Sequence, residues 1–169
     1  SASQVWAQPH VDEWKYVSPT GAVADTILKS FQTSIDELLT TARSAAPSNV
    51  LIAMKTVALS TTLVTADIAK YESQPENELG ALSAQQREDV ETLKTSISDA
   101  LTNLMNACRN HASSQGLAPV SLIDAAATHV AIAVVEVVKL LKLRRVPRPS
   151  EDDFSFESTN DATELSSPP

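Results

Sequence analysis

Apolar residues recur through the middle of the chain at alternating spacings of three and four residues. The second such stretch, for example, reads Val50, Met54, Val57, Thr61, Val64, Ile68 and Tyr71. This spacing places the side chains on one face of a helix, and it occurs in four stretches. The predicted helices span residues 19–44, 49–72, 84–112 and 121–145.

The order and spacing of these helices predict the fold. An alternation of three and four averages about 3.5 residues, the period at which helices pack in left-handed bundles. The connections are short, so that neighbouring helices should run in opposite directions. We expect an all-α, antiparallel, up-down-up-down four-helix bundle over residues 18–146. An extended aromatic arm (1–17) should precede the bundle, and a disordered acidic tail (147–169) should follow it.

Local signals at the helix ends support these bounds. Ser18 and Pro19 suit the start of the first helix, because serine caps free N–H groups and proline fits the first turn. Ser83 and Gln86 have the spacing of a capping box at the start of the third helix. Pro147 prevents the fourth helix from continuing further.

Composition argues against several classes of function. Only 3 of the 169 residues are glycine, which disfavours glycine-rich phosphate-binding loops. The chain has 21 acidic and 13 basic residues, a net charge of −8, and so lacks the charge pattern of a nucleic-acid-binding protein. A single cysteine allows no internal disulfide, which favours a reducing, intracellular setting. The most apolar stretch, residues 117–143, contains several ionisable residues and is therefore a poor membrane span.

The residues that could carry catalysis or bind metal do not form a recognisable site. His111 follows Cys108 by three residues, but nothing nearby resembles the oxyanion hole that a nucleophile would need. We interpret Cys108 as a small apolar residue that is buried in the core. We interpret His129 as an exposed histidine. Asp67 and Asp124 lie beside the apolar faces, where hydrogen bonds between helices are commoner than catalysis. We therefore predict no enzyme activity, no cofactor and no metal.

The fourth helix has more apolar residues than one inward face needs. Ile132 and Val135 flank that face, and Lys139 and Lys142 lie on the same outer side. On the first helix, Ile27 leaves the inward face toward a side that small residues such as Ser30 extend. The first and fourth helices are neighbours in this topology, so the two sets predict an apolar groove with a basic rim. Such a groove suits an acidic amphipathic helix. The candidate site is Ile27, Ser30, Ile132, Val135, Lys139 and Lys142.

Three other interpretations of these residues stay open. They could cover one another or the aromatic arm, or they could close a homodimer. The basic cluster from Lys139 to Arg148 could also meet anionic lipid. The six acidic residues that follow Pro149, with no basic residue among them, weaken the lipid interpretation.

Three segments of the chain resemble a known domain family. They are ALTNLMNACRNHASSQGLAPVSLIDAAATHVAIAVVEVVKLLKL, VLIAMKTVALSTTLVTADIAKYE and WKYVSPTGAVADTILKSFQ. Together they resemble the C-terminal helical domain of the GIT family of Arf GTPase-activating scaffolds, a domain related in shape to the focal-adhesion-targeting bundle. The pattern is most like the GIT-type domain of fungal polarisome scaffolds, over residues ~14 to 146.

The resemblance implies an adaptor without catalytic activity. GIT-type and focal-adhesion-targeting bundles bind acidic, leucine-rich LD-type helices, commonly between their first and fourth helices. The matching positions here are Ile27, Ser30, Ile132, Val135, Lys139 and Lys142. The expected partners are polarity or cytoskeletal regulators, and the expected location is the cytoplasm at cortical sites of polarised growth, such as a bud or hyphal tip. No integral membrane contact is expected, and homo-oligomerisation of a scaffold is the alternative role.

Overall fold

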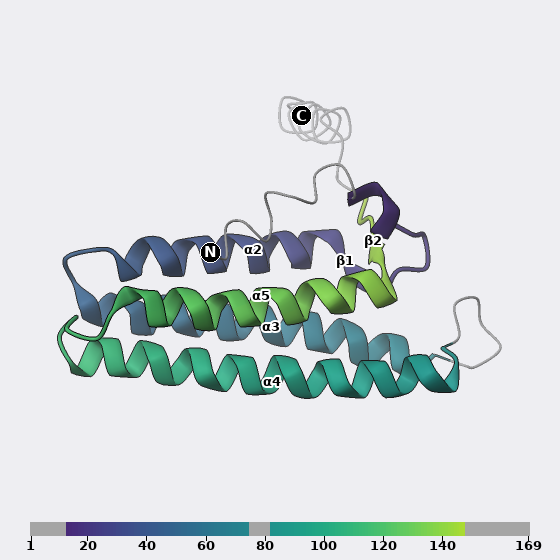
Figure 1. Ribbon diagram of the computed structural model, residues 1–169. Helices are drawn as coiled ribbons and strands as arrows, with labels where there is room; N and C mark the ends of the chain where they lie inside the picture. Colours follow the sequence, from purple (N-terminus) through teal and green to yellow (C-terminus); the bar gives the residue numbers. More distant parts are fainter. Residues whose placement is uncertain (1–12, 75–81, 148–169) are drawn as a thin grey trace, which may run out of the picture.

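The computed structural model describes residues 13–74 and 82–147, and four long helices account for most of them (Figure 1). They are α2 (Asp25–Ala42), α3 (Val50–Glu72), α4 (Ala84–Ser113) and α5 (Val120–Leu141). Two short 3₁₀ helices, η1 (Glu13–Tyr16) and η2 (Pro47–Asn49), and two strands of two residues each, β1 (Val23–Ala24) and β2 (Leu143–Arg144), complete the fold. The predicted all-helical class with four long helices is confirmed. Residues 1–12 of the predicted arm and residues 148–169 of the predicted tail lie outside the described residues.

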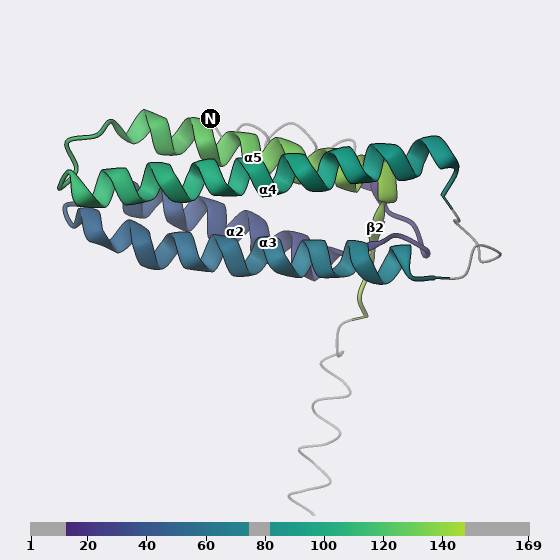
Figure 2. The same ribbon diagram turned by 90° about the horizontal axis from the view of Figure 1, so that it is seen from below.

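The four helices occupy the corners of a bundle. α2 packs against α3 and α5, and α4 packs against the same two helices. As a result α3 and α5 lie at diagonally opposite corners, and Figure 2 shows α2 and α3 below α4 and α5. The start of α2 lies beside the end of α5, where β1 pairs with β2. This arrangement gives α3 and α5 outer surfaces that face away from each other.

The inward faces predicted from the apolar spacing form a single core. Phe31 and Ile35 of α2, Leu104 of α4 and Ile123 of α5 have at most 1% of their surface exposed. Burial of a large aliphatic or aromatic side chain contributes roughly 1.5–3 kcal/mol, so the inward faces supply much of the stability. The core also includes Val23 and Leu143, which belong to the two short strands.

The capping box predicted for the third helix is confirmed at the start of α4. The Ser83 hydroxyl accepts a hydrogen bond from the Gln86 backbone N–H at 3.2 Å. In return, the Gln86 side-chain oxygen accepts one from the Ser83 N–H at 2.9 Å. The two residues therefore satisfy N–H groups that have no partner inside the helix.

The predicted start of the first helix, at residue 19, is wrong. α2 begins at Asp25, and residues 17–24 form a strap along the end of α5, with a turn in which the Gly21 N–H donates to the Ser18 carbonyl at 3.1 Å. The Ser18 N–H donates to the Leu143 carbonyl at 2.7 Å, and the Ala22 N–H donates to the Leu141 carbonyl at 3.0 Å. These distant partners satisfy the backbone of the strap, so the local helix signal of Ser18 and Pro19 does not decide its structure.

The fourth helix also ends earlier than predicted. α5 ends at Leu141, and Lys142 has a positive φ of 69°, which turns the chain into β2. Pairing with β1 and burial of Leu143 then replace the last predicted turn of helix. Gly21 is required in the strap, because a Cβ atom there would overlap the Leu143 backbone.

Candidate interaction surfaces

The α5 residues of the predicted groove lie at the surface in the second half of that helix. Ile132 is 45% exposed, Lys139 is exposed, and Val135 is half-buried between them. Val135 is three residues from Ile132 and four from Lys139, so the three side chains lie on one side of the helix. We call Ile132, Val135, Lys139 and Lys142 the α5 site.

Both lysines of the α5 site have partners within the chain. The Lys139 ammonium lies 3.5 Å from a carboxylate oxygen of Glu136, one turn earlier. The Lys142 ammonium lies 5.2 Å from the centre of the Tyr16 ring, which belongs to η1. Exposed ion pairs and cation–π contacts of this kind contribute about 0–1 kcal/mol each. A ligand could therefore exchange these contacts for its own at small cost.

The structure does not place Ser30 with the α5 site. Ser30 is exposed and lines a hollow between α2 and α3, together with Thr56 and Ser60 of α3. Ser34, one turn further along α2, lines the same hollow. Ile27 is half-buried against the core, one turn before Ser30. Ser30 therefore lines the side of α2 that faces α3, whereas the groove expected between Ile27 and the fourth helix stays a prediction.

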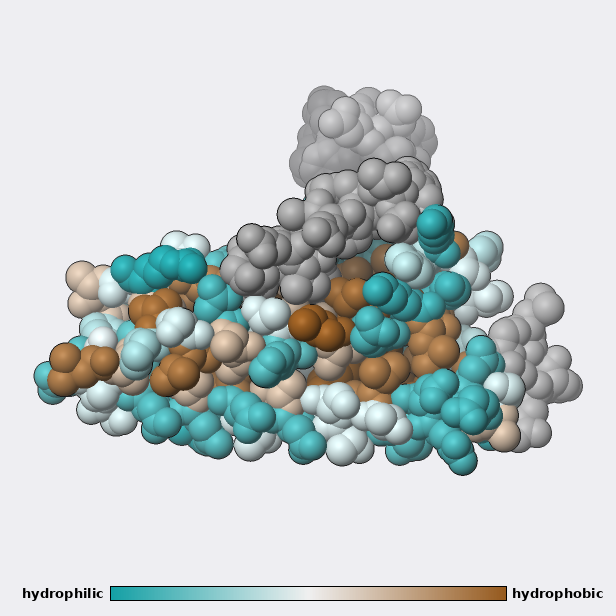
Figure 3. Space-filling model, in the orientation of Figure 1, coloured by the Kyte–Doolittle hydropathy of each residue, from teal (hydrophilic) through white to brown (hydrophobic). Residues whose placement is uncertain are grey.

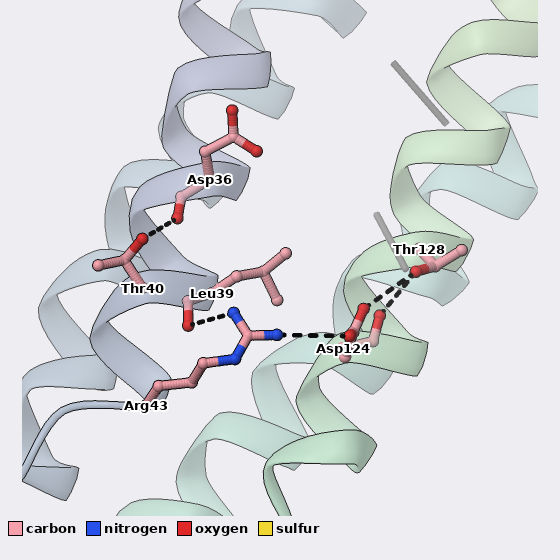
Figure 4. Close-up of polar contacts among 6 residues, drawn as sticks. All are labelled: Asp36, Leu39, Thr40, Arg43, Asp124 and Thr128. Carbon is pink, nitrogen blue, oxygen red and sulfur yellow. Dashed lines mark hydrogen bonds and ion pairs between the residues drawn. The ribbon is translucent and has the colours of Figure 1, made fainter. Parts of the chain in front are cut away.

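A different set of residues forms the edge between α2 and α5. Arg43, just after α2, lies 3.8 Å from the Asp124 carboxylate of α5 and donates to the Leu39 carbonyl at 3.2 Å (Figure 4). The Thr128 hydroxyl donates to the Asp124 carbonyl at 2.8 Å. Asp124 thus links α5 to the residue that follows α2 through an ion pair.

The surface around α5 is mixed in polarity. Figure 3, in the orientation of Figure 1, shows brown apolar surface along α5 that teal polar residues interrupt. Single apolar residues on a protein surface are ordinary. The combination of exposed Ile132 with half-buried Val135 and two lysines is what distinguishes the α5 site.

Sequence reasoning missed an exposed apolar surface on α3. Ile52 and Leu59 are each 69% exposed, and Leu63 is 49% exposed. Their spacing of seven and four residues places them on one side of the helix, away from the core. The signal was present in the sequence as a second apolar series within residues 49–72, out of phase with the inward series.

The cysteine and histidine near the end of α4 are structural. Cys108 is fully buried, as predicted, and burial raises the pKa of its thiol to about 11. It is therefore a protonated thiol at neutral pH and not an available nucleophile. His111 is 3% exposed, and its Nδ1 lies 3.1 Å from the Ala118 carbonyl, which joins α4 to the loop before α5. Among the described residues, no cluster of three or more His, Cys, Asp or Glu could hold a metal ion.

Two helical segments are long and apolar enough to cross a membrane by length and composition alone. They are Pro47–Glu72 and Val120–Leu141. Each contributes an inward apolar face to the core, as the core helices of bundles do. In the most apolar 18-residue stretch of Pro47–Glu72, however, only 39% is buried. Many apolar residues of this segment therefore lie on the surface.

Comparison with known proteins gives one match. Residues 18–144 match the model of a family described as the C3G9 VBS-like domain, that is, a vinculin-binding-site-like helical domain. The match covers more than half of the chain and includes all four long helices. This family is a related class of helical domain. The match gives no specific support for the resemblance to GIT-type or polarisome domains. No curated protein and no solved structure matches the chain.

Proposed function

Because the chain belongs to the C3G9 VBS-like domain family, we propose that it is a protein-interaction domain that acts as a non-catalytic adaptor. In this proposal an antiparallel, up-down-up-down bundle binds an acidic amphipathic helix of a partner protein at the α5 site. The observation that carries it is the exposed Ile132 beside half-buried Val135, with exposed Lys139 on the same side and Lys142 directly after the end of α5.

The chemistry of the α5 site fits such a helix. Ile132 and Val135 offer an apolar contact to leucines spaced three or four residues apart, and the two lysines offer partners to flanking carboxylates. Lys142 and the Tyr16 ring close one end of the site, since the ammonium lies over the ring. Ser30 is left out of the proposed site because it lines the hollow between α2 and α3.

A matched pair of variants tests this proposal. The probe is a synthetic helical peptide with leucines on one side and glutamates on its flanks, and its binding is measured by fluorescence anisotropy. Ile132→Asp places a carboxylate in the apolar contact and should weaken binding by roughly tenfold or more. Leu122→Asp is the control, because Leu122 is also on α5, is 55% exposed and lies ten residues from Ile132.

The two variants should differ in their affinity for the peptide but not in their stability. Both variants should unfold at the same urea concentration as the parent protein, since both positions are exposed. Equal weakening by both variants, or no binding of the peptide to the parent protein, would contradict the proposed site. A salt-insensitive affinity would also contradict it, because the exposed lysines should attract the acidic peptide less as salt rises.

We further propose that the domain belongs to a cell-polarity scaffold in the cytoplasm, at cortical sites of polarised growth. The support is the resemblance of three segments of the chain to GIT-type domains. The partners would be polarity or cytoskeletal regulators that present acidic amphipathic helices. A fluorescent fusion of the domain in a budding or hyphal fungal cell should concentrate at the growing tip, and the Ile132→Asp variant should spread through the cytoplasm. A uniform signal from the parent fusion would overturn this part of the proposal.

A further inference from the structure

α3 carries two apolar faces, and only one of them is covered. The inward face includes Val57, Val64 and Ile68, which have no exposed surface. A second series runs along the outer side at spacings of four, three, four, three and four residues, and every member is exposed. This outer series is Ile52, Thr56, Leu59, Leu63, Ala66 and Lys70.

The spacing of the outer series indicates that its occupant is a helix. An alternation of four and three residues is the period of a seam between two helices that pack side by side. Ile52, Leu59 and Leu63 would be the bulky members of such a seam, and each is about half exposed or more. Three large apolar residues aligned on one helix are not the scattered exposure that ordinary surfaces show.

The groove beside the outer series carries acidic residues at one end. Two open hollows of about 460 and 660 Å³ lie along the line between α2 and α3. Asp36 and Glu37 of α2 line the second hollow together with Ile52 of α3. The other end of the outer series is basic, because it finishes at the exposed Lys70.

We propose that this face binds a second copy of the chain, with the two α3 helices packed antiparallel. The two-fold axis would cross α3 at the level of Thr61, whose own side chain is buried in the core. The outer series is symmetric about that position. Leu59 then meets Leu63 of the second copy, Thr56 meets Ala66, and Ile52 meets Lys70. A two-fold interface requires such self-complementary pairs, since every contact occurs twice.

Charge complementarity favours a second copy over other occupants. The Lys70 stem would pack on Ile52 of the second copy, and its ammonium would lie near Asp36 and Glu37, which line the hollow beside Ile52. An acidic helix from another protein would bring like charges to these two residues. The acid-rich segment of this chain after Pro149 would do the same.

The dimer leaves the α5 site free. α3 contacts α2 and α4 but lies diagonally opposite α5, so the outer series and the α5 site face away from each other. A dimer formed through α3 would therefore present two α5 sites to separate partners. This inference concerns a different surface and does not rest on the function proposed for α5.

Sedimentation of the purified chain over a wide concentration range is the first test. The parent chain should pass from monomer to dimer as its concentration rises. Leu59→Glu should weaken the dimer by roughly a hundredfold or more, because the two-fold axis places the new carboxylate in the interface twice. Leu122→Glu, at a similarly exposed position on α5, should dimerise like the parent.

A charge exchange makes the test specific to the proposed geometry. Glu37→Lys and Lys70→Glu should each weaken the dimer, and the double variant should restore it. A parent chain that stays monomeric, a dimer that survives Leu59→Glu, or a double variant that fails to recover would overturn the proposal. Peptide binding by the Leu59→Glu monomer should equal that of the parent, which separates failure here from failure of the α5 site.

Discussion

The Asp67 carboxylate should hold the strap (residues 17–24) and the start of α2 in place, and its removal should loosen both. Asp67 belongs to α3 and is only 7% exposed. One of its carboxylate oxygens accepts a hydrogen bond from the Ala24 N–H at 2.9 Å. Ala24 is the N-cap of α2 and provides no side-chain cap. The carboxylate therefore accepts, from a neighbouring helix, the N-cap N–H that the N3 side chain of a capping box would accept locally.

The expected magnitude follows from this geometry. A buried hydrogen bond to a charged group contributes about 1.5–3 kcal/mol, and its loss leaves a buried N–H without a partner. The negative charge near the positive end of α2 adds about 0.3–1 kcal/mol. We therefore expect Asp67→Ala to lower the free energy of unfolding by about 2–4 kcal/mol.

Urea unfolding followed by circular dichroism measures this loss, and hydrogen exchange locates it. Asp67→Asn is the matched control, because it keeps an oxygen acceptor but removes the charge, and it should lose less than Asp67→Ala. The amides of Ala22, Val23 and Ala24 should exchange faster in Asp67→Ala. Unfolding of Asp67→Ala at the parent urea concentration would refute the capping role. Equal losses in both variants would show that the charge, and not the hydrogen bond, carries the effect.

Three further perturbations test other parts of the fold. Gly21→Ala should destabilise the protein by about 1–3 kcal/mol in the same urea assay, because the new methyl group overlaps the Leu143 backbone. The Cys108 thiol, whose pKa burial raises to about 11, should react with a thiol reagent at mildly alkaline pH only after urea unfolds the protein. Rapid reaction of the folded protein would contradict its burial. The pKa of Lys94 is raised above 10.5, first by its hydrogen bond to Glu72. The contribution of Lys94 to stability is present at neutral pH and is lost as the pH rises through the raised pKa. The difference in urea midpoint between Lys94→Met and the parent protein should therefore shrink as the pH is raised toward 10.5.

The inward faces of the helices could be predicted because helix burial follows the spacing of apolar residues. The start of α4 could also be predicted, since Ser83 and Gln86 lie within one turn of each other. The start of α2 could not, because residues 17–24 are held by Leu143 and Asp67, which are far away in the sequence. Such long-range hydrogen bonds outweigh the local capping signals in deciding where α2 begins.

The exposure of the candidate residues could be predicted better than their neighbours in space, for a geometric reason. Periodicity gives the angle of a residue around its own helix, which placed Ile132 and Lys139 on the outer side of α5. Periodicity does not say which neighbouring helix lies on each side of a given helix. The sequence therefore could not show that Ser30 lies between α2 and α3. The outer series of α3 was difficult to recognise in the sequence, because apolar residues on two faces of one helix weaken the periodic pattern of either face.

The mass of the complex between the parent chain and the acidic helical peptide decides whether α3 and α5 carry two separate binding surfaces. Sedimentation equilibrium at a concentration where the chain is dimeric gives the stoichiometry. Opposed surfaces on α3 and α5 predict a complex of two chains and two peptides. A complex of one chain and one peptide, formed as the dimer dissociates, would show that the peptide and the second copy compete for one surface and would overturn the separation of the two sites.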